Sequence, residues 1–327
     1  MTLEFSAHWP PSASLAALRS RAEQSAFVRG FFAARQVLEV ETPVLGRHGV
    51  SDLNLDGIAA DLHGVPGWPD ARAWLQTSPE YHMKRLLAAG SGPIFQIARA
   101  FRDGERGRRH NPEFSLLEWY RPGFDDQALM AEVGELVCGW LELPRPQRLS
   151  YRQACRQYAG LDPFEASDAQ LASRCETWLG EGGARGLSRD ECLDLVMSHA
   201  VEPALRTEPP TFIDRYPASQ AALARTSVEE GMVVAHRFEL YVAGIELCNG
   251  YWELTDPAEQ RRRFEMDNTL RRRAGKREMA ADGYLLAALA RGLPDCAGVA
   301  LGLDRLLMLK LGLDDIAGVL PFPVERA

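Results

Sequence analysis

The sequence predicts an α+β fold, in which an antiparallel β-sheet is flanked by helices. Two pairs of strand-like segments support this prediction. GPIFQIARAFR (92–102) is followed, after an arginine-rich loop, by EFSLLEWYR (113–121), and HRFELYV (236–242) is followed by IELCNGYWEL (245–254) around Gly244. Short connections of this kind join antiparallel neighbours, whereas parallel strands need a long crossover. Segments with helical periodicity lie before, between and after the pairs, which is typical of an α+β domain.

The helices are placed by spacing and by start signals. Apolar residues recur at helical spacing from about Ser14 to Arg35, and the alternation that follows up to Pro43 predicts a strand. Ser78 and Pro79 form a start signal for a helix, with serine as N-cap and proline at the first helical position. Further helices are expected at about 125–143, at 256–277 and after Gly302.

The chain of 327 residues is expected to form one domain, 1–327, with an irregular loop at 48–67 and a helical insertion at about 144–210. The net charge of -8 argues against a general nucleic-acid coat. No basic and apolar leader opens the chain, and no apolar run reaches the length of a membrane span. Six scattered cysteines without a C-x-x-C pair read as buried thiols, so we expect a cytoplasmic protein.

The loop between the first two strands carries Arg102, Arg106, Arg108 and Arg109 in a chain that is acidic overall. Clustered arginines repel one another unless an anion lies among them, and the guanidinium fork suits phosphate oxygens. The chain has no GxxxxGK[ST] motif, and no GxGxxG follows a strand. Arginine side chains, rather than a glycine-rich loop, are therefore expected to hold an anionic ligand.

An acidic group lies on the second strand pair. Glu239, Glu246 and Glu253 are spaced by seven residues, and Asn249 lies between the last two. If the chain turns at Gly244, carboxylates from both strands can face one cleft. Proteins hold Mg²⁺ with one or two carboxylates together with substrate phosphates. Solvent-facing strand glutamates are the alternative for any single one of the three.

A third motif, Gly298-Val-Ala-Leu-Gly-Leu-Asp-Arg305, completes a set that resembles the class II aminoacyl-tRNA synthetases. The arginine loop between strands resembles their motif 2, this segment their motif 3, and Val37 to Pro43 the dimer-forming motif 1. TSPE (77–80), RHNPEF (109–114), LEWY (117–120) and NGYWEL (249–254) are similar to the lysyl-tRNA synthetase core. The residues before TSPE are too few for an OB-fold anticodon-binding domain. A core without this domain is similar to the elongation factor P lysine ligase (EpmA/PoxA/GenX) family. The segments TSPEYHMKRLL and PDCAGVALGLDRLLML, the second of which contains Ala300, also resemble that family.

The resemblance implies an ATP-dependent ligase that forms an aminoacyl-adenylate of (R)-β-lysine or lysine and transfers the acyl group to a lysine of elongation factor P. It implies Mg²⁺ and a homodimer, and neither a membrane nor tRNA is expected as a partner. The implied ATP-binding residues are Arg102, Asp103, Gly104, His110, Asn111, Phe114, Glu246, Leu247, Gly302 and Arg305, of which Arg102, Glu246 and Arg305 are catalytic. The implied substrate-binding residues are Ser78, Pro79, Glu80, Tyr120, Asn249, Tyr251, Glu253 and Ala300, and the implied metal ligands are Glu239 and Glu246.

One position departs from the family pattern. Where motif 2 has a glutamate that reads the adenine amino group, this chain has Gly104, so that either the backbone at 104 or Glu105 is expected to read adenine. Eight basic residues from Arg261 to Arg277 form either a solvated helix face or a docking surface for an acidic acceptor protein. The alternatives in function are a minimal lysyl-tRNA synthetase, an asparagine-synthetase-like ligase and a catalytically inactive, synthetase-like amino-acid sensor.

Overall fold

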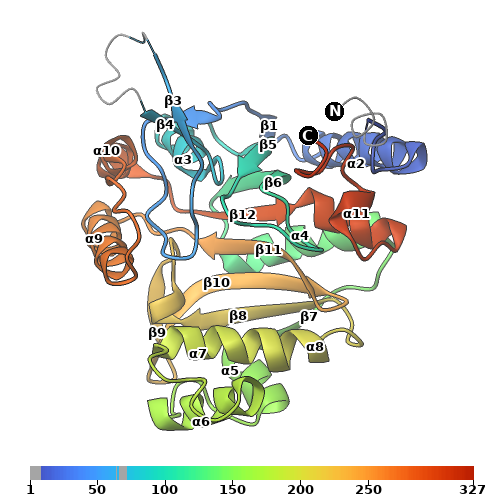
Figure 1. Ribbon diagram of the computed structural model, residues 1–327. Coiled ribbons are helices and arrows are strands. Elements are labelled where there is room, and N and C mark those ends of the chain that lie inside the picture. The colour runs from blue at the N-terminus through green and yellow to red at the C-terminus, as the bar shows by residue number, and fades with distance from the viewer. Residues whose placement is uncertain (1–8, 64, 66–71) are drawn as a thin grey trace, which may run out of the picture. The chain divides into compact units, whose positions relative to one another are not determined.

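The computed structural model describes residues 9–63, 65 and 72–327 (Figure 1). The first part of the predicted leader-free N-terminus and the end of the predicted loop at 48–67 lie outside these residues. The chain divides into two compact units, one of Met1–Gly123 and Thr255–Ala327 and the other of Phe124–Leu254. The prediction of a single domain stays a prediction, and each unit is described by itself.

Four strands form the sheet of the first unit. β5 (Ile94–Phe101) and β6 (Glu113–Pro122) are antiparallel, as predicted, and β12 (Cys296–Gly302) is antiparallel to β6. β1 (Leu38–Glu39) pairs with β5 in parallel, and it is shorter than the predicted strand at 37–43. The amides of Leu38 and Val40 still donate to carbonyls at 93 and 95. The chain then reaches Pro43, which has no N–H to donate.

In the described part of the first unit, five α-helices and a small sheet accompany these strands. The helices are α2 (Leu15–Ala33), α3 (Glu80–Ala88), α9 (Pro257–Arg273), α10 (Gly283–Gly292) and α11 (Leu303–Leu311). β2 (Leu45–Gly46), β4 (Arg72–Leu75) and β3 (Ala59–Asp61) form the small sheet, with β4 in the middle. Phe32 of α2 stacks on Phe95 with ring centroids 4.4 Å apart and meets Trp119 edge-on, so α2 packs against β5 and β6.

The start of α3 is one residue later than predicted. Pro79 is the N-cap and Glu80 the first helical residue, whereas the sequence placed Ser78 at the cap. Ser78 nevertheless performs the chemistry of a cap, because its Oγ accepts a hydrogen bond of 3.0 Å from the Glu80 amide.

The second unit is built on the predicted hairpin of β10 (Met232–Val242) and β11 (Ile245–Trp252). Gly244 makes the turn with φ of +69°, and a Cβ there would lie 2.7 Å from the Glu202 carbonyl oxygen. β8 (Thr211–Pro217) and β9 (Thr226–Glu229) are antiparallel to β10. β7 (Gln147–Ser150) is parallel to β8. The α+β class is confirmed, although the pairs β1–β5 and β7–β8 make the strand pairing mixed rather than purely antiparallel.

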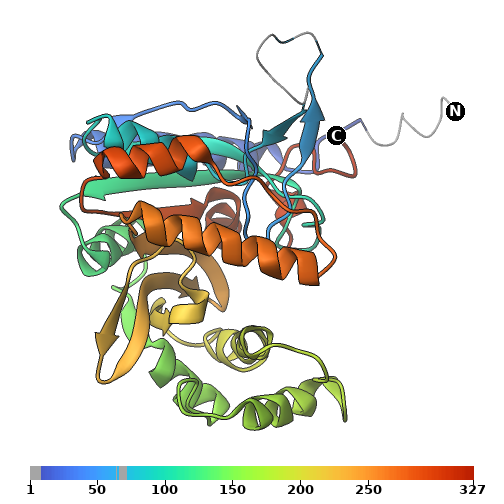
Figure 2. The same cartoon turned by 90° about the vertical axis from the view of Figure 1, so that its left-hand side faces the viewer.

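Helices follow β7 through most of the region predicted to be a helical insertion. They are α5 (Tyr151–Ala154), α6 (Asp168–Leu179), α7 (Arg189–Val196) and α8 (Glu202–Ala204), with π-helical turns at Cys155–Ala159 and Met197–Val201. α5, α6 and α7 each begin with a capping box, formed by Ser150 with Gln153, Ser167 with Gln170, and Ser188 with Glu191. The yellow-green helices gather beside β8 in both views (Figures 1 and 2). Whether this region is an insertion stays a prediction.

Two general expectations agree with the structure. All six cysteines are free and buried. α4 (Asp126–Leu141) lies within the predicted 125–143 segment. Among the helices of the described residues, none combines the length and apolar character that a membrane crossing requires.

Candidate active site

Arg102 lies directly after β5, at the base of the arginine loop. Its amide donates to the Pro112 carbonyl across the hairpin, at 2.9 Å. Its guanidinium lies 5.0 Å from the Phe114 ring centroid and 3.4 Å from a Glu105 oxygen. Glu105 therefore pairs with the guanidinium that is expected to bind a phosphate group. Phe114 offers an aromatic face beside the same guanidinium. Gly104 has φ of +75° with open space where a side chain would project.

The C-terminal segment holds the tip of the arginine loop. Arg106 pairs with Glu325 at 2.5 Å, and the Arg108 carbonyl accepts from the Ile316 amide at 2.8 Å. Asn111 is buried, and both ends of its amide group form hydrogen bonds with the backbone. Its Nδ2 donates to the Glu113 carbonyl at 2.7 Å, and its Oδ1 accepts from the Val324 amide at 3.0 Å. These contacts make Asn111 an anchor of the C-terminal segment, and its predicted contact with adenine stays a prediction.

Arg305 and His110 lie together beside this loop. The Arg305 guanidinium is 2.7 Å from His110 Nε2 and 3.3 Å from the Arg109 carbonyl. Burial and then the neighbouring Arg305 cation lower the pKa of His110. A neutral His110 can accept the Arg305 hydrogen bond through Nε2. Gly302 is the N-cap of α11, so β12 leads directly into the helix that carries Arg305.

Glu118 joins two predicted substrate residues in the first unit. Its carboxylate is 2 % exposed and accepts from Ser78 Oγ at 2.6 Å and from the Tyr120 hydroxyl at 2.7 Å. Ala300 is its cross-strand partner on β12. Directly opposed residues share one face of a sheet. The structure thus brings Ser78, Tyr120 and Ala300 together around a residue to which the sequence analysis gave no role.

Glu80 already has a cationic neighbour. Lys84, one helical turn along α3, is buried and donates to a Glu80 oxygen at 2.6 Å. This is an i,i+4 pair within a largely buried environment. An incoming ammonium group would share the Glu80 carboxylate with Lys84.

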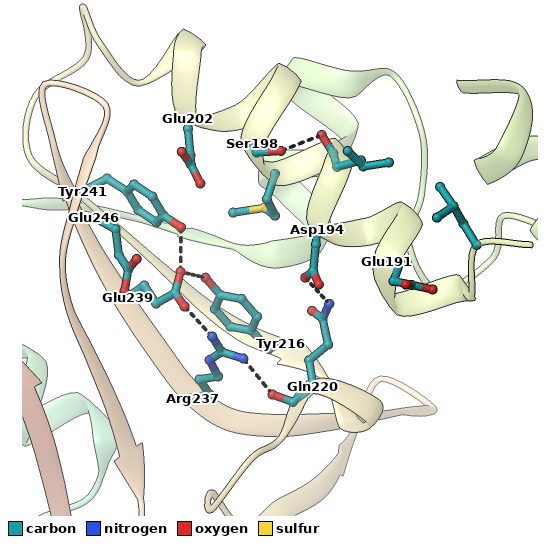
Figure 3. A pocket seen from close by; sticks show the side chains of 13 residues that line it. Glu191, Asp194, Ser198, Glu202, Tyr216, Gln220, Arg237, Glu239, Tyr241 and Glu246 are labelled. Atoms are coloured by element: carbon teal, nitrogen blue, oxygen red, sulfur yellow. Dashed lines mark hydrogen bonds and ion pairs between the residues drawn. The ribbon is translucent and has the colours of Figure 1, made fainter. Parts of the chain in front are cut away.

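The second unit contains a pocket of about 540 Å³ between the β10–β11 hairpin and the helices (Figure 3). Glu239 and Glu246 both line it, as predicted for carboxylates on the two strands. The rest of its wall comes mainly from α7, the turn after it and β8. These lining residues are Leu187, Glu191, Asp194, Leu195, Met197, Ser198, Glu202, Tyr216, Gln220, Arg237 and Tyr241.

Asp194 lines the pocket with a carboxyl group whose pKa is raised. Burial of its carboxyl group raises the pKa to about 6, with a smaller opposing effect from Arg237 and further increases from Asp190 and Glu239. The residue as a whole is exposed on α7, and Gln220 donates to its carboxyl group at 2.9 Å. Solvent reaches the exposed residue and screens its charge, so the raised pKa of Asp194 contributes little to the stability of the fold.

Glu239 is held by three donors. The hydroxyls of Tyr216 and Tyr241 each donate to Oε2 at 2.5 Å, and Arg237 donates to Oε1 (Figure 3). Burial and then the Glu239 charge raise the pKa of both phenols, so both remain donors. A metal ion at Glu239 would compete with these three donors for the lone pairs of the carboxylate. The predicted role of Glu239 as a metal ligand stays a prediction that its contacts do not favour.

The other predicted residues of this unit lie along β11. Asn249 is opposite Glu239 in the strand register, and Tyr251 is opposite Arg237. The side chain of Leu247 is buried, so any contact with ATP would be made by its backbone. Glu253 is 1 % exposed, and its carbonyl accepts from Arg225 at 3.1 Å.

Two residues of the site were missed from the sequence, Glu118 and Arg237. The first lies inside the LEWY motif and the second two residues before Glu239, and alternation along a strand places residues two apart on one face. Within the described ranges, no three His, Cys, Asp or Glu side chains gather as a possible metal site.

Comparisons with known proteins show which family the chain is similar to. Residues 10–326 match the family described as tRNA synthetases class II (D, K and N). A protein of Sodalis glossinidius named elongation factor P--(R)-beta-lysine ligase is 48% identical over 323 residues, which are 98% of this chain and 99% of that protein. A Salmonella dublin protein of the same name is 48% identical over 322 residues, with the same coverage.

Proposed function

The chain belongs to the class II tRNA synthetase family (D, K and N), and from this premise we propose that it is an ATP-dependent ligase that attaches (R)-β-lysine to a lysine side chain of elongation factor P. The observation that carries the proposal is 48% identity, over 98% of the chain, to two proteins named for this reaction. The presence of Arg102, Glu118 and Arg305 in the first unit and of Glu246 in the second supports an active enzyme rather than an amino-acid sensor.

In the first step, a carboxylate oxygen of the amino acid attacks the α-phosphorus of ATP. The bond to the bridging oxygen breaks, and pyrophosphate leaves with the electron pair. Negative charge grows on the α-phosphate, which a positioned guanidinium stabilises. Arg102 supplies this cation once Glu105, which now lies 3.4 Å from it, gives way to the phosphate. Phe114 provides a stacking face for the adenine.

In the first unit, Glu80 is the proposed partner of a substrate ammonium group. In the second unit, Glu253 is proposed as an ammonium partner. A carboxylate attracts an ammonium group, whereas an apolar side chain offers its charge no compensation, and this favours a diamino acid as substrate. Ala300, opposite Glu118, adds a methyl group beside Ser78 and Tyr120 and favours the β-isomer over α-lysine.

In the second step, the unprotonated amine of the acceptor lysine attacks the carbonyl carbon of the adenylate. A C–N bond forms, the C–O bond to the phosphate breaks, and AMP leaves while the amine loses a proton. Acyl transfer of this kind needs the reacting amine held close to the carbonyl carbon, on one face of the carbonyl group.

Glu246 is the residue that would hold Mg²⁺, and the ion would supply positive charge to the ATP phosphates. A cation there would neutralise phosphate charge during the first step. Glu239 fits this role poorly, because its two oxygens already accept hydrogen bonds from Tyr216, Tyr241 and Arg237.

We also propose a cytoplasmic homodimer. Leu38, Val44 and Leu45, on the segment that resembles motif 1, are exposed, Leu38 by 57 %. Exposed apolar residues gathered on one short segment are typical of a protein interface. Six free cysteines suit a reducing compartment.

The test is an acceptor assay with purified protein, ATP, Mg²⁺ and labelled (R)-β-lysine or α-lysine. Elongation factor P is added to one reaction and total tRNA to another. We expect label on elongation factor P, more of it from (R)-β-lysine, and none with Arg102→Ala. Label on tRNA would instead identify a minimal synthetase. Pyrophosphate exchange is measured in parallel, and its absence would favour the amino-acid sensor.

A further inference from the structure

The pocket wall on β10 contains a hydrogen-bonded chain that runs from two tyrosines through Glu239 and Arg237 to Asn249 (Figure 3 shows it as far as Arg237). We propose that Arg237 is a positioning residue for substrate binding, with Glu239 as its counter-ion rather than a metal ligand. This inference rests on the proposed function, because it assigns Asn249 to the amino-acid site.

Glu239 has little capacity left for a metal. It is 6 % exposed, and its two oxygens accept from two phenols and a guanidinium. Hydrogen-bond donors can compensate the burial of a carboxylate without a metal. Replacing the Arg237 contact by a cation would leave a second cation, the guanidinium, facing it in the same space.

Arg237 is held on three sides. Nη2 donates to Glu239, Nη1 donates to the Gln220 carbonyl at 2.9 Å, and Nε donates to Asn249 Oδ1 at 3.2 Å. The guanidinium also lies 4.4 Å from the Tyr216 ring centroid. Burial disfavours its charge, but the Glu239 carboxylate raises the pKa of Arg237 above its ordinary value. A planar fork with this many acceptors has one orientation.

This orientation determines which end of the Asn249 amide faces the substrate. A guanidinium can only donate, so Asn249 must turn Oδ1 toward Arg237. Nδ2 then points away from Arg237 and presents N–H donors. Donors suit a carboxylate or phosphate oxygen of the amino acid or its adenylate, and they do not suit an ammonium group. Arg237 would thereby select the end of the substrate that binds here.

Four variants test the inference: Glu239→Gln, Arg237→Lys, Asn249→Asp, and Glu181→Gln as a control that removes an exposed charge in the same unit. Pyrophosphate exchange gives KM for (R)-β-lysine and for ATP. Electron paramagnetic resonance measures the binding of Mn²⁺ in the presence of a non-hydrolysable ATP analogue, which reports on the metal without turnover. Thermal unfolding checks the fold.

For Glu239→Gln and Arg237→Lys we expect KM for (R)-β-lysine to rise about a hundredfold, as for other misplaced binding groups. KM for ATP and the Mn²⁺ affinity should stay within about twofold, as in Glu181→Gln. Asn249→Asp keeps the bond to Arg237 but loses the Nδ2 donors, so it should raise the same KM while unfolding at the wild-type temperature.

A tenfold loss of Mn²⁺ affinity in Glu239→Gln, with KM for the amino acid unchanged, would make Glu239 a metal ligand and overturn the inference. Equal rises in both KM values in Arg237→Lys would reduce Arg237 to a structural role. If Arg237→Lys does not fold, Tyr241→Phe, which removes one donor to Glu239, replaces it with the same expected pattern at a smaller size. An inactive wild-type protein would count against the proposed function, whereas wild-type exchange with unaffected variants counts against this inference alone.

Discussion

Replacement of Glu118 by glutamine tests whether a buried carboxylate organises the amino-acid site of the first unit. Glu118 accepts from Ser78 at 2.6 Å and from Tyr120 at 2.7 Å. Glutamine keeps the length of the side chain and one oxygen, but it removes the charge and replaces the other oxygen by a donor. Both hydroxyls then lose a charged acceptor, and one of them must rotate to accept instead.

The size of the effect follows from these two bonds. A hydrogen bond to a charged group contributes about 1.5–3 kcal/mol and a neutral one about 0.5–1.5 kcal/mol, so each bond should weaken by about 1 kcal/mol. If the loss of about 2 kcal/mol is expressed in substrate binding, KM for (R)-β-lysine should rise about thirtyfold. Stability should change little, because a neutral amide is easier to bury than a carboxylate.

The assay is pyrophosphate exchange with (R)-β-lysine and ATP varied separately. Glu113→Gln is the matched control, since Glu113 lies on the same strand but is exposed and pairs only loosely with Arg99, at 3.7 Å. We expect the control to match the wild type in both KM values. An amino-acid KM within twofold of the wild type in Glu118→Gln, or a parallel rise for ATP, would refute the proposed role of Glu118.

Three further predictions concern stability, docking and substrate choice. Asp126 is buried, and burial opposes its charge, but His236 and Arg215 lower its pKa below the ordinary value of 3.8. The stability that the ionised carboxylate contributes is therefore present above pH 3.8. It is lost as the pH falls through the lower pKa of the folded state. Asp126→Asn should thus destabilise the protein at pH 7, with the difference shrinking toward pH 3 in urea unfolding, and a pH-independent difference would contradict this. Arg271 is 3 % exposed and pairs with Asp56 at 2.9 Å, so Arg271→Glu should lower the melting temperature. Exposed Arg273→Glu should keep the melting temperature and weaken only acceptor modification, and an equal loss of pyrophosphate exchange would exclude a docking role. Ala300→Gly should reduce the preference for (R)-β-lysine over α-lysine by about 1–3 kcal/mol, and an unchanged ratio of kcat/KM values would remove Ala300 from substrate choice.

The basic run from Arg261 to Arg277 illustrates what a one-dimensional pattern leaves open. The sequence analysis treated its residues alike, as a solvated face or a docking surface. In the structure Arg271 is buried, Arg263 pairs with Glu259, and Lys276 pairs with Asp56, whereas Arg261 and Arg273 are exposed. Any docking surface formed by these basic residues is therefore smaller than the segment from Arg261 to Arg277 and excludes Arg271.

Local signals predicted the elements well. The paired strands, the turn at Gly244 and the helix after Gly302 depend on residue alternation, backbone freedom and capping, which act between residues a few positions apart. The three capping boxes at Ser150, Ser167 and Ser188 were also readable, and they would have located the helices within 144–210. The parallel pairs at β1 and β7 were not readable, because their partners lie far along the chain.

Residue type and spacing predicted the fold class and the main elements, and motifs of four to sixteen residues predicted the family. Only the folded structure shows which partner each polar or charged side chain meets. Glu118 meets Ser78, forty residues away, Asn111 meets Val324, and Glu239 meets Tyr216 across two strands. The physical reason is that the role of a charged side chain depends on which partner neutralises it. Such partners are brought together only when the chain folds, so residue type and spacing do not reveal them.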